Sequence, residues 1–405
     1  MLSPSICDQV RRTAPLLQAE GQALTRAFYA RLFRFHPALR EMFNQGHQHD
    51  GEQSRALAGA VTAYALHVDD PTPLRPYLAR IMHKHVSLGV RAEHYDLVGQ
   101  ELLAAMDEVF AGRLDAATRD AWAAAYGQLA TLMIEEEAAM YRASAVGEGG
   151  WTGWRSFRVT GRHCESEQIV SFELAPADGG RAPDFLPGQY VSVRVQVPAL
   201  GFSQVRQYSL SAAPDPRTLR ISVKREIGGE AAPDGHVSNV LHDSVFPGDL
   251  LELSPPAGEF VLRGTGHTPV VLISAGVGAT PLLSMLARLL EQPSPPPIRF
   301  LHACRNGTLH AWKQPMRDLV QRMGPSSVRV YYERPEPGDV IGRDHDHAGR
   351  MDLAAVREDV VLPDADYYLC GPKGFMREQA GALRALGVSA DRIHAEVFGS
   401  GDWQT

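Results

Sequence analysis

The first third of the chain places a histidine, His85, on an apolar helix face. The spacing i, i+3, i+4 and i+7 connects Leu78, Ile81, Met82 and His85. A neutral imidazole in an apolar pocket can ligate a haem iron through one ring nitrogen while the other bonds a neighbouring group. The spacing alone also fits a core histidine bonded to a backbone carbonyl, which is the more common role.

Three other side chains in this region have both a chemical and a structural interpretation. Gln53 shares a helical face with Leu57, so its amide could donate to a bound ligand or lie at an exposed rim. Tyr29 lies in an aromatic segment, where core packing is the usual role. Glu135 opens a run of three glutamates, and the spacing does not choose among the three.

A four-residue segment further along, Arg206 to Ser209, has side chains suited to a flavin nucleotide. Alternation along a strand puts Arg206 and Tyr208 on one side and Gln207 and Ser209 on the other. An arginine can pair with a phosphate, a tyrosine can cover a flat ring, and a serine can bond a ring nitrogen. By itself this match is weak.

A glycine loop lies between an apolar strand and a helix, and it consists of Gly276, Val277, Gly278, Ala279, Thr280 and Pro281. Glycines let a pyrophosphate approach the backbone, and a helix N-terminus offers free N–H groups and a positive dipole end. Pro281 stands where the third glycine of the dinucleotide fingerprint would fall. The loop is a modest signal for nucleotide binding.

The distribution of proline predicts the elements that position these residues. Residues 1–150 hold 6 of the 28 prolines, so long helices fit there and strands and turns fit the remainder. At roughly 150 residues per domain, 405 residues predict two to three domains. We expect an all-α domain over 1–140 and a linker over 141–153.

Two further domains are predicted by strand patterns. Short strands without long helices between them predict an antiparallel β-barrel over 154–264. Apolar strands separated by helical stretches predict an α/β domain with a parallel sheet over 265–405.

Composition and charge exclude several classes. With 44% hydrophobic and 21% charged residues the chain is not globally disordered, and a net charge of −7 argues against a nucleic-acid binder. The uncharged stretch Pro269–Ala287 contains glycines and a proline, so we expect no membrane span. Four scattered cysteines and no signal-peptide pattern predict a cytoplasmic protein.

The first third, taken together, resembles the globin domain of the flavohaemoglobins, the bacterial and fungal nitric oxide dioxygenases. The resemblance covers residues 1–140 and rests on Phe28-Tyr29, His36-Pro37, Phe43-Asn44, Gln53, Leu57, Lys84-His85, Leu88-Gly89-Val90 and His94-Tyr95. It implies a haem b, with Tyr29 bonding the bound oxygen. Gln53 and Leu57 would then line the distal pocket and Phe43 would pack against the haem.

On the proximal side, the resemblance implies that His85 ligates the iron. Tyr95 and Glu135 would form a network with that histidine, and Lys84 would tune the haem potential. Only the resemblance selects Glu135 from its run. A carboxylate near the free N–H of the imidazole increases its basicity and favours activation of oxygen over storage.

The remainder resembles the ferredoxin reductase-like flavin and nicotinamide domains. The shared motifs are Pro187-Gly188-Gln189-Tyr190, Arg206-Gln207-Tyr208-Ser209, Gly235-His236-Val237-Ser238-Asn239, Gly276 to Pro281 and Cys370-Gly371-Pro372. The resemblance implies FAD, with Arg206, Ser238 and Asn239 towards the pyrophosphate. It places Tyr190, Tyr208 and Ser209 towards the isoalloxazine.

The C-terminal segment Val397-Phe398-Gly399-Ser400 resembles the family segment that returns an aromatic side chain to the flavin. Phe398 could then gate nicotinamide entry, or it could simply anchor the tail. Ser400 stands where most members have proline, which leaves its contact open.

The order of domains predicts the function. Nicotinamide gives two electrons as hydride, haem iron accepts one at a time, and a flavin does both. We therefore expect a monomeric nitric oxide dioxygenase that uses NAD(P)H, FAD and haem to convert nitric oxide and O2 to nitrate. The alternatives are a flavin reductase of ferric chelates, quinones or hydroperoxides with an accessory globin, and a gas sensor. Arg305 hints weakly at NADPH without deciding between the nicotinamide cofactors.

Overall fold

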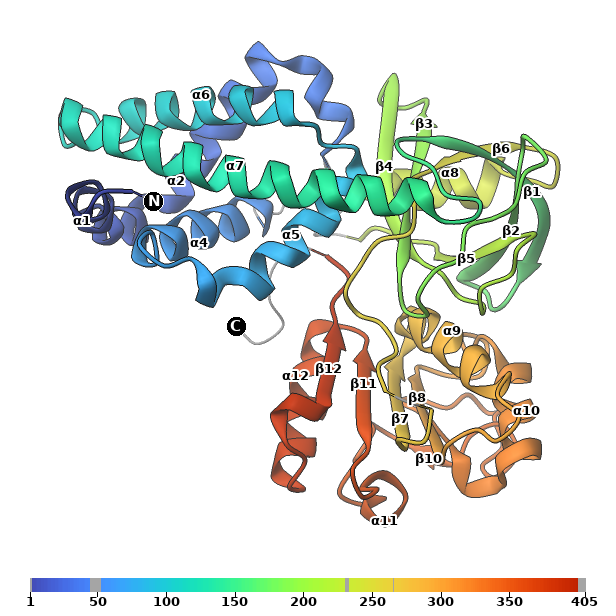
Figure 1. Ribbon diagram of the computed structural model, residues 1–405. Coiled ribbons are helices and arrows are strands. Elements are labelled where there is room, and N and C mark those ends of the chain that lie inside the picture. The colour runs from blue at the N-terminus through green and yellow to red at the C-terminus, as the bar shows by residue number, and fades with distance from the viewer. Residues whose placement is uncertain (1, 44–51, 230–232, 265, 400–405) are drawn as a thin grey trace.

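The computed structural model describes residues 2–43, 52–229, 233–264 and 266–399, and in residues 52–53 only the backbone. Three units follow one another along the chain, as expected (Figure 1). A helical unit comes first, a curled antiparallel sheet second and a parallel sheet with covering helices third. The predicted fold class is therefore confirmed.

The helical unit is built from helices of very different length. Its elements are α1 (Pro4–Arg12), α2 (Ala14–Phe35), η1 (Pro37–Glu41), α4 (Glu52–Leu66), η2 (Thr72–Leu74), α5 (Arg75–Leu88), α6 (Ala92–Val109) and α7 (Ala116–Val146). Asp115 caps the start of α7, which runs along the whole unit towards the second one (Figure 1). Because α7 ends only at Val146, the first six residues of the expected linker 141–153 are helical.

The second unit is a six-stranded antiparallel sheet with one helix, α8 (His236–Ser244). Its strands are β1 (Arg155–Cys164), β2 (Ile169–Pro176), β3 (Tyr190–Val197), β4 (Phe202–Ser209), β5 (Leu219–Lys224) and β6 (Leu250–Leu253). In space they lie in the order β4-β3-β6-β1-β2-β5. A bridge between Leu210 and Ile221 brings the two ends of this order together, so the sheet curls on itself.

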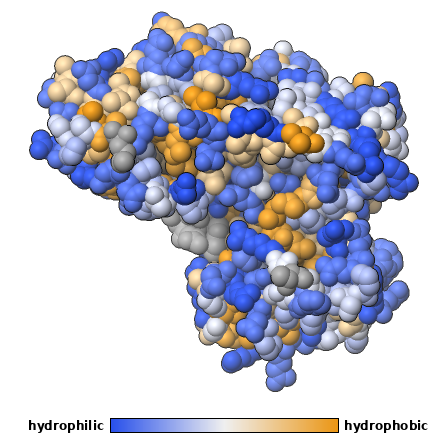
Figure 2. Space-filling view, viewed as in Figure 1, coloured by the Kyte–Doolittle hydropathy of each residue, from blue (hydrophilic) through white to orange (hydrophobic). Residues whose placement is uncertain are grey.

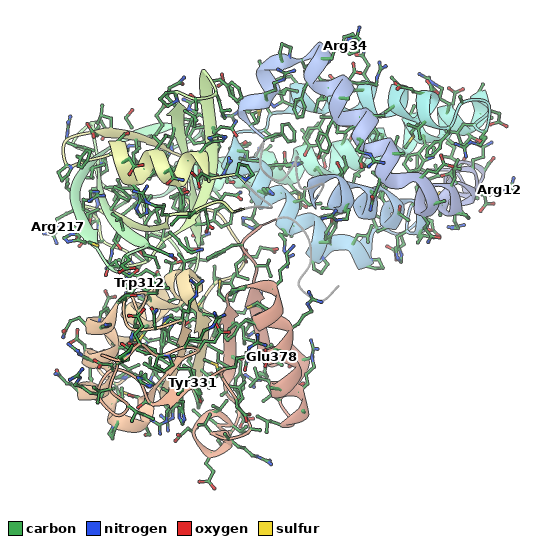
Figure 3. All side chains as sticks on the ribbon, turned by 180° about the vertical axis from the view of Figure 1, so that it is seen from behind. Arg12, Arg34, Arg217, Trp312, Tyr331 and Glu378 are labelled. Carbon is green, nitrogen blue, oxygen red and sulfur yellow. The ribbon has the colours of Figure 1, made fainter. Side chains whose placement is uncertain are left out.

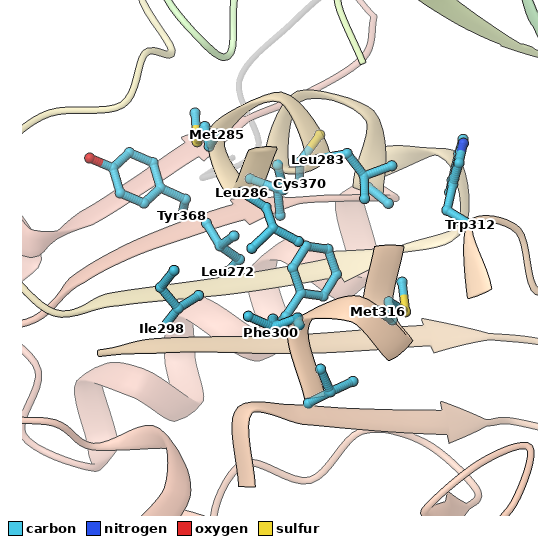
Figure 4. Close-up of a cluster of buried hydrophobic side chains, with 14 of the residues drawn as sticks. Leu272, Leu283, Met285, Leu286, Ile298, Phe300, Trp312, Met316, Tyr368 and Cys370 are labelled. Atoms are coloured by element: carbon cyan, nitrogen blue, oxygen red, sulfur yellow. The ribbon is translucent and has the colours of Figure 1, made fainter. Parts of the chain in front are cut away.

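The third unit is a parallel sheet in the order β10-β9-β8-β7-β11-β12. Its strands are β7 (Val270–Ala275), β8 (Ile298–Cys304), β9 (Val328–Tyr332), β10 (His347–Ala348), β11 (Asp366–Cys370) and β12 (Ile393–Glu396). Its helices are η3 (Gly276–Gly278), α9 (Ala279–Leu290), α10 (Lys313–Met323), η4 (Pro325–Ser327), α11 (Arg357–Val360), α12 (Lys373–Ala385) and η5 (Ala390–Arg392). Leu272 and Phe300 of the sheet pack with Leu286 of α9 in a fully buried core (Figure 4).

The surface is mostly polar, and apolar side chains gather near α9, where the third unit meets the second (Figure 2). Arg12 and Arg34 lie on the outer surface of the helical unit, whereas Trp312 and Tyr331 lie inside the third unit (Figure 3). Among the described residues, no helix combines the length and the apolarity needed to cross a membrane.

Candidate functional site

Helix α5 holds the candidate iron ligand in its last turn. The helix ends at Gly89, which has a left-handed φ of +78° that a side chain would disfavour. The amide of Val90 closes this end by donating to the carbonyl of His85 at 3.0 Å. The backbone around His85 is therefore fixed by its own helix cap.

A hydrogen-bond network surrounds one ring nitrogen of His85. The Nδ1 atom lies 2.9 Å from Oε1 of Glu137 and 3.1 Å from the hydroxyl of Tyr95. The Tyr95 hydroxyl also donates to the same Glu137 oxygen at 2.6 Å. Because Nδ1 faces the carboxylate, Nε2 is the ring nitrogen left to ligate a metal.

The carboxylate in this network is Glu137, so the prediction of Glu135 for this position is wrong. Glu135 is exposed, whereas the Glu137 side chain is only 4% exposed. The reason is helical phase: at about 100° per residue, Glu137 lies one turn beyond the buried Met133, and Glu135 lies on the opposite side. Continuing the apolar stripe of α7 by four residues from Met133 would have found it.

Burial and neighbouring residues fix the protonation state and the position of Tyr95. Burial and the neighbouring Glu137 carboxylate both raise the pKa of Tyr95, so its phenol stays protonated and donates. The Tyr126 hydroxyl donates to the backbone carbonyl of Tyr95 at 2.5 Å and fixes that residue in turn. Gly99 makes this possible, because a Cβ there would lie 2.3 Å from the Tyr126 ring.

On the other side of the helical unit, an aromatic cluster surrounds Tyr29. Its ring lies 5.8 Å from that of Phe43 and 5.9 Å from that of Phe33. Leu57 is partly buried against the same core. Gln53 lies in α4, but its side chain lies outside the described residues. The structure thus brings together Tyr29, Phe43 and the Leu57 core region.

Lys84 lies beside His85 in sequence but points to a different face of α5. Burial lowers the pKa of its ammonium. A partly desolvated positive charge next to the ligand turn suits the predicted influence on haem potential, which stays a prediction.

In the second unit, the flavin motifs meet on neighbouring strands. Tyr190 of β3 is the register partner of Ser209 of β4, so two predicted isoalloxazine contacts lie side by side. Tyr208 packs against the apolar core of the sheet, and burial raises the pKa of its phenol. Burial lowers the pKa of Arg206, whose guanidinium donates to uncharged oxygens of its own strand, among them the Val205 carbonyl at 2.8 Å. A guanidinium with uncharged partners can still bind a phosphate.

The side chains of three other predicted flavin contacts have hydrogen-bond partners within the protein. Gln207 donates to the Ser87 hydroxyl of α5 at 3.1 Å. Ser238 and Asn239 donate to the Gly235 carbonyl at 3.0 and 2.9 Å and so hold the loop before α8. The first amides of α8 have no side-chain cap, and free amides at the start of a helix can bind an anion such as a pyrophosphate.

The glycine loop of the third unit lies very close to the end of β11, the strand beside β7 in the sheet. A Cβ on Gly278 would lie 2.3 Å from the carbonyl oxygen of Cys370, so only glycine fits there. Gly276 has a φ of +54° and open space beside its Cα, as a phosphate-binding loop requires. Thr280 closes the loop by donating to the Val277 carbonyl at 2.9 Å, and Ala279 and Pro281 are buried in the first turn of α9.

A pocket of about 670 Å³ extends from this loop. Its lining includes Gly276 and Gly371, which follow strands β7 and β11, and the side chains of Arg305, Glu333 and Phe398. The Phe398 ring is 44% exposed, Val397 packs against the sheet, and Gly399 has a φ of +131°. Ser400 lies outside the described residues.

One acidic residue at the junction of the units was missed by the sequence patterns. Glu396 ends β12, and burial raises its pKa to about 7, with a smaller contribution from Glu259. Arg80 of α5 opposes this shift, and the charge of Glu396 also acts on Tyr190. No signal marked Glu396 in the sequence, because these neighbours come from the two other units.

Family models match each unit in turn. Residues 26–133 match the globin family, residues 156–262 match the oxidoreductase FAD-binding domain, and residues 272–380 match the oxidoreductase NAD-binding domain. The flavohemoprotein of Bordetella parapertussis is 55% identical over 402 residues, which cover 99% of each chain. The flavohemoprotein of Chromobacterium violaceum is 54% identical over 400 residues, again 99% of each.

The chain belongs to the flavohemoprotein family. Its structure is similar to a flavohemoglobin from Malassezia yamatoensis determined with bound FAD and haem, with a TM-score of 0.85 and 26% identity over 98% of this chain and all of the other. The FAD/NAD-binding domain of a nitric oxide dioxygenase from Vibrio cholerae matches 60% of this chain and 98% of its own, with a TM-score of 0.54 and 42% identity. Family membership confirms haem, FAD and a nicotinamide nucleotide as the cofactors of the three units.

Proposed function

We propose that this flavohemoprotein is a nitric oxide dioxygenase, which converts nitric oxide and O2 to nitrate with electrons from NAD(P)H. The observation that carries the proposal is the His85–Tyr95–Glu137 network in a globin joined to a flavin and nicotinamide reductase. The solved reductase domain of a nitric oxide dioxygenase, 42% identical to this chain, supports it.

The residues present suit a haem. His85 offers Nε2, and the buried Glu137 carboxylate accepts a hydrogen bond from Nδ1–H and holds the ring in one orientation. Haem iron ligated by such an imidazole supplies the site where diatomic gases react. We assign Tyr29 and Leu57, which pack in the same apolar cluster as Phe43, to the distal side of the haem.

The reductase units supply the electrons. In this proposal Tyr190, Ser209 and Arg206 bind the flavin and the Gly276 loop binds the nicotinamide nucleotide, which the pairing of Tyr190 with Ser209 and the pocket beside Gly276 support. Nicotinamide gives two electrons as hydride and haem iron takes them singly, so the flavin between them performs the conversion. Each NAD(P)H oxidised then supports the conversion of two nitric oxide and two O2 molecules to two nitrates, with release of one proton.

The direct test measures nitric oxide with an electrode while purified holoprotein, O2 and NADH are added in turn. We expect consumption only when all are present, with two nitrates formed per NADH. Consumption that does not depend on O2 or on NADH would reject the proposal.

The His85→Ala variant separates this function from that of a flavin reductase with an accessory globin. We expect nitric oxide consumption to disappear, while reduction of ferricyanide by NADH through the flavin continues. Retention of full nitric oxide consumption without the ligand would instead make the flavin the site of the reaction.

We also propose that the protein acts as a monomer in the cytoplasm. None of its four cysteines forms a disulfide, which fits a reducing compartment. Light scattering after size-exclusion chromatography tests the first point, since a dimer would elute with twice the mass of 44.3 kDa. Cell fractionation tests the second.

A further inference from the structure

Helix α5 has a second face, which contacts the reductase. Arg80, His83, Lys84 and Ser87 follow the spacing i, i+3, i+4 and i+7, displaced by two residues from the face that ends at His85. The Nδ1 atom of His83 accepts the backbone N–H of Gly258 at 3.0 Å. The same helix therefore carries the candidate iron ligand and the contact with the flavin unit (Figure 1).

Ser87 forms the most buried contact of this second face. Its side chain has no solvent exposure, and its hydroxyl donates to the Lys84 carbonyl at 2.8 Å. The same oxygen accepts from Nε2 of Gln207 at 3.1 Å. Ser87 also acts as a hydrogen-bonding neighbour of the Tyr190 phenol, whose pKa it lowers against the larger effect of burial.

The positions of the bonded residues make this contact relevant to electron transfer. Ser87 is two residues from His85 in the last turn of α5, and Gln207 is two residues from Ser209 in β4. The bond thus joins the turn that holds the iron ligand directly to the strand that faces the flavin. Electron transfer slows steeply as the distance between donor and acceptor grows. A bond that holds these two segments together therefore helps to set the distance between the flavin and the haem.

We propose that Ser87 and Gln207 are positioning residues that hold α5 against the flavin strand and so set the rate of electron transfer from flavin to haem. They take no part in hydride transfer from the nicotinamide nucleotide, because neither residue lines the pocket beside Gly276 that we assign to it. The proposal rests on the electron route of the proposed function.

The first test follows Ser87→Ala by anaerobic stopped flow with NADH, with flavin and haem absorbance recorded separately. We expect haem reduction to slow about five-fold, as for the loss of one buried hydrogen bond, and flavin reduction to keep its rate. Ser144→Ala is the matched control, because the Ser144 hydroxyl donates only within α7, to the Met140 carbonyl. Slowing of both steps, or of neither, would overturn the proposal.

A second test separates positioning from general loosening of the fold. If the two residues act through one bond, the Ser87→Ala/Gln207→Ala double variant, saturated with FAD, transfers electrons no more slowly than the slower single variant. Hydrogen exchange should rise in the last turn of α5 and in β4, while the thermal midpoint and the ferric haem spectrum stay unchanged. Additive losses, or exchange that rises throughout the helical unit, would contradict the proposal. If haem in the unaltered protein is not reduced by NADH, the proposed function fails instead.

Discussion

Two hydrogen-bonded histidine sites, the half-buried His85 in the helical unit and the buried pair His302 and His310 in the nucleotide unit, differ in their partners. In the first, Nδ1 of His85 faces the Glu137 carboxylate and the Tyr95 hydroxyl. In the second, Nδ1 of His302 lies 2.8 Å from the Ser274 hydroxyl, and its ring stacks on that of His310 at 5.5 Å. The first cluster thus contains an anion and the second contains only neutral groups.

The second cluster also uses both ring nitrogens of one histidine. His310 bonds the Tyr332 hydroxyl through Nδ1 at 2.8 Å and contacts the sulfur of Met316 through Nε2 at 3.5 Å. Burial lowers the pKa of His302 to about 4 and that of His310 to about 2, so both rings stay neutral in the core.

The difference shows what distinguishes a ligand from a core residue. A carboxylate on Nδ1 makes an imidazole more basic and leaves Nε2 directed at a ligand site. Hydroxyl and thioether partners satisfy the ring without creating a ligand. Burial alone therefore does not identify a functional histidine, and the charge of its partner does.

Removing the anion is the strongest way to break this comparison. Glu137→Gln keeps a hydrogen-bond acceptor for His85 but loses the charge, and we expect nitric oxide consumption to fall by about 10- to 100-fold. Glu135→Gln, on the exposed face of α7, is the control and should retain full activity. An equal loss in both variants would show that the total charge of the glutamate run, and not Glu137 in particular, acts on His85.

Acid should destabilise the nucleotide unit through its histidine pair. Folding lowers the pKa of His302 from about 6.5 to about 4. As the pH falls, this residue is therefore protonated in the unfolded chain before it is protonated in the folded chain. This contribution to stability is complete above pH 6.5 and falls by about 1.4 kcal/mol per pH unit down to about pH 4. Hydrogen exchange of β7 and β8 between pH 7 and 4 measures it. In His302→Gln the dependence of stability on pH should weaken. An unchanged dependence would exclude His302 as its source.

The Tyr95 hydroxyl should matter less than the carboxylate. Tyr95→Phe leaves the bond between His85 and Glu137 in place, so we expect about a five-fold loss of nitric oxide consumption. Tyr64→Phe also removes a buried phenol in the helical unit, one that donates to the Ala125 carbonyl at 2.8 Å, and should leave the activity intact. A larger loss at Tyr95 than at Glu137 would reverse the order of the two partners.

The smallest effect is expected when a histidine of the neutral cluster is replaced. His310→Phe should leave the haem spectrum and the rate of haem reduction unchanged, because the ring lies in the core of the nucleotide unit. Ultraviolet–visible spectra recorded before and after mixing with NADH check this. A shifted haem band would show that the two clusters are coupled.

Much of the fold followed from local patterns. Alternating and apolar runs predict strands at Tyr190–Val197 and Val328–Tyr332, and β3 and β9 have those bounds because such runs are local signals. The end of α7 was less predictable, since no proline marks it and the helix continues to Val146. The short strands β10 and β12 carry no pattern of their own and pair only where the sheet offers an edge.

For the site, the residue types and motifs could be read from the sequence, including His85, Tyr95 and the glycine loop after β7. Which glutamate faces His85 became clear only from the packing of the helices, because the choice depends on the phase of α7 against α5. It also decided that Gln207 bonds Ser87 and that Glu396 lies among charges of other units. Each of these joins residues distant in sequence, and such contacts form only when helices and sheets pack.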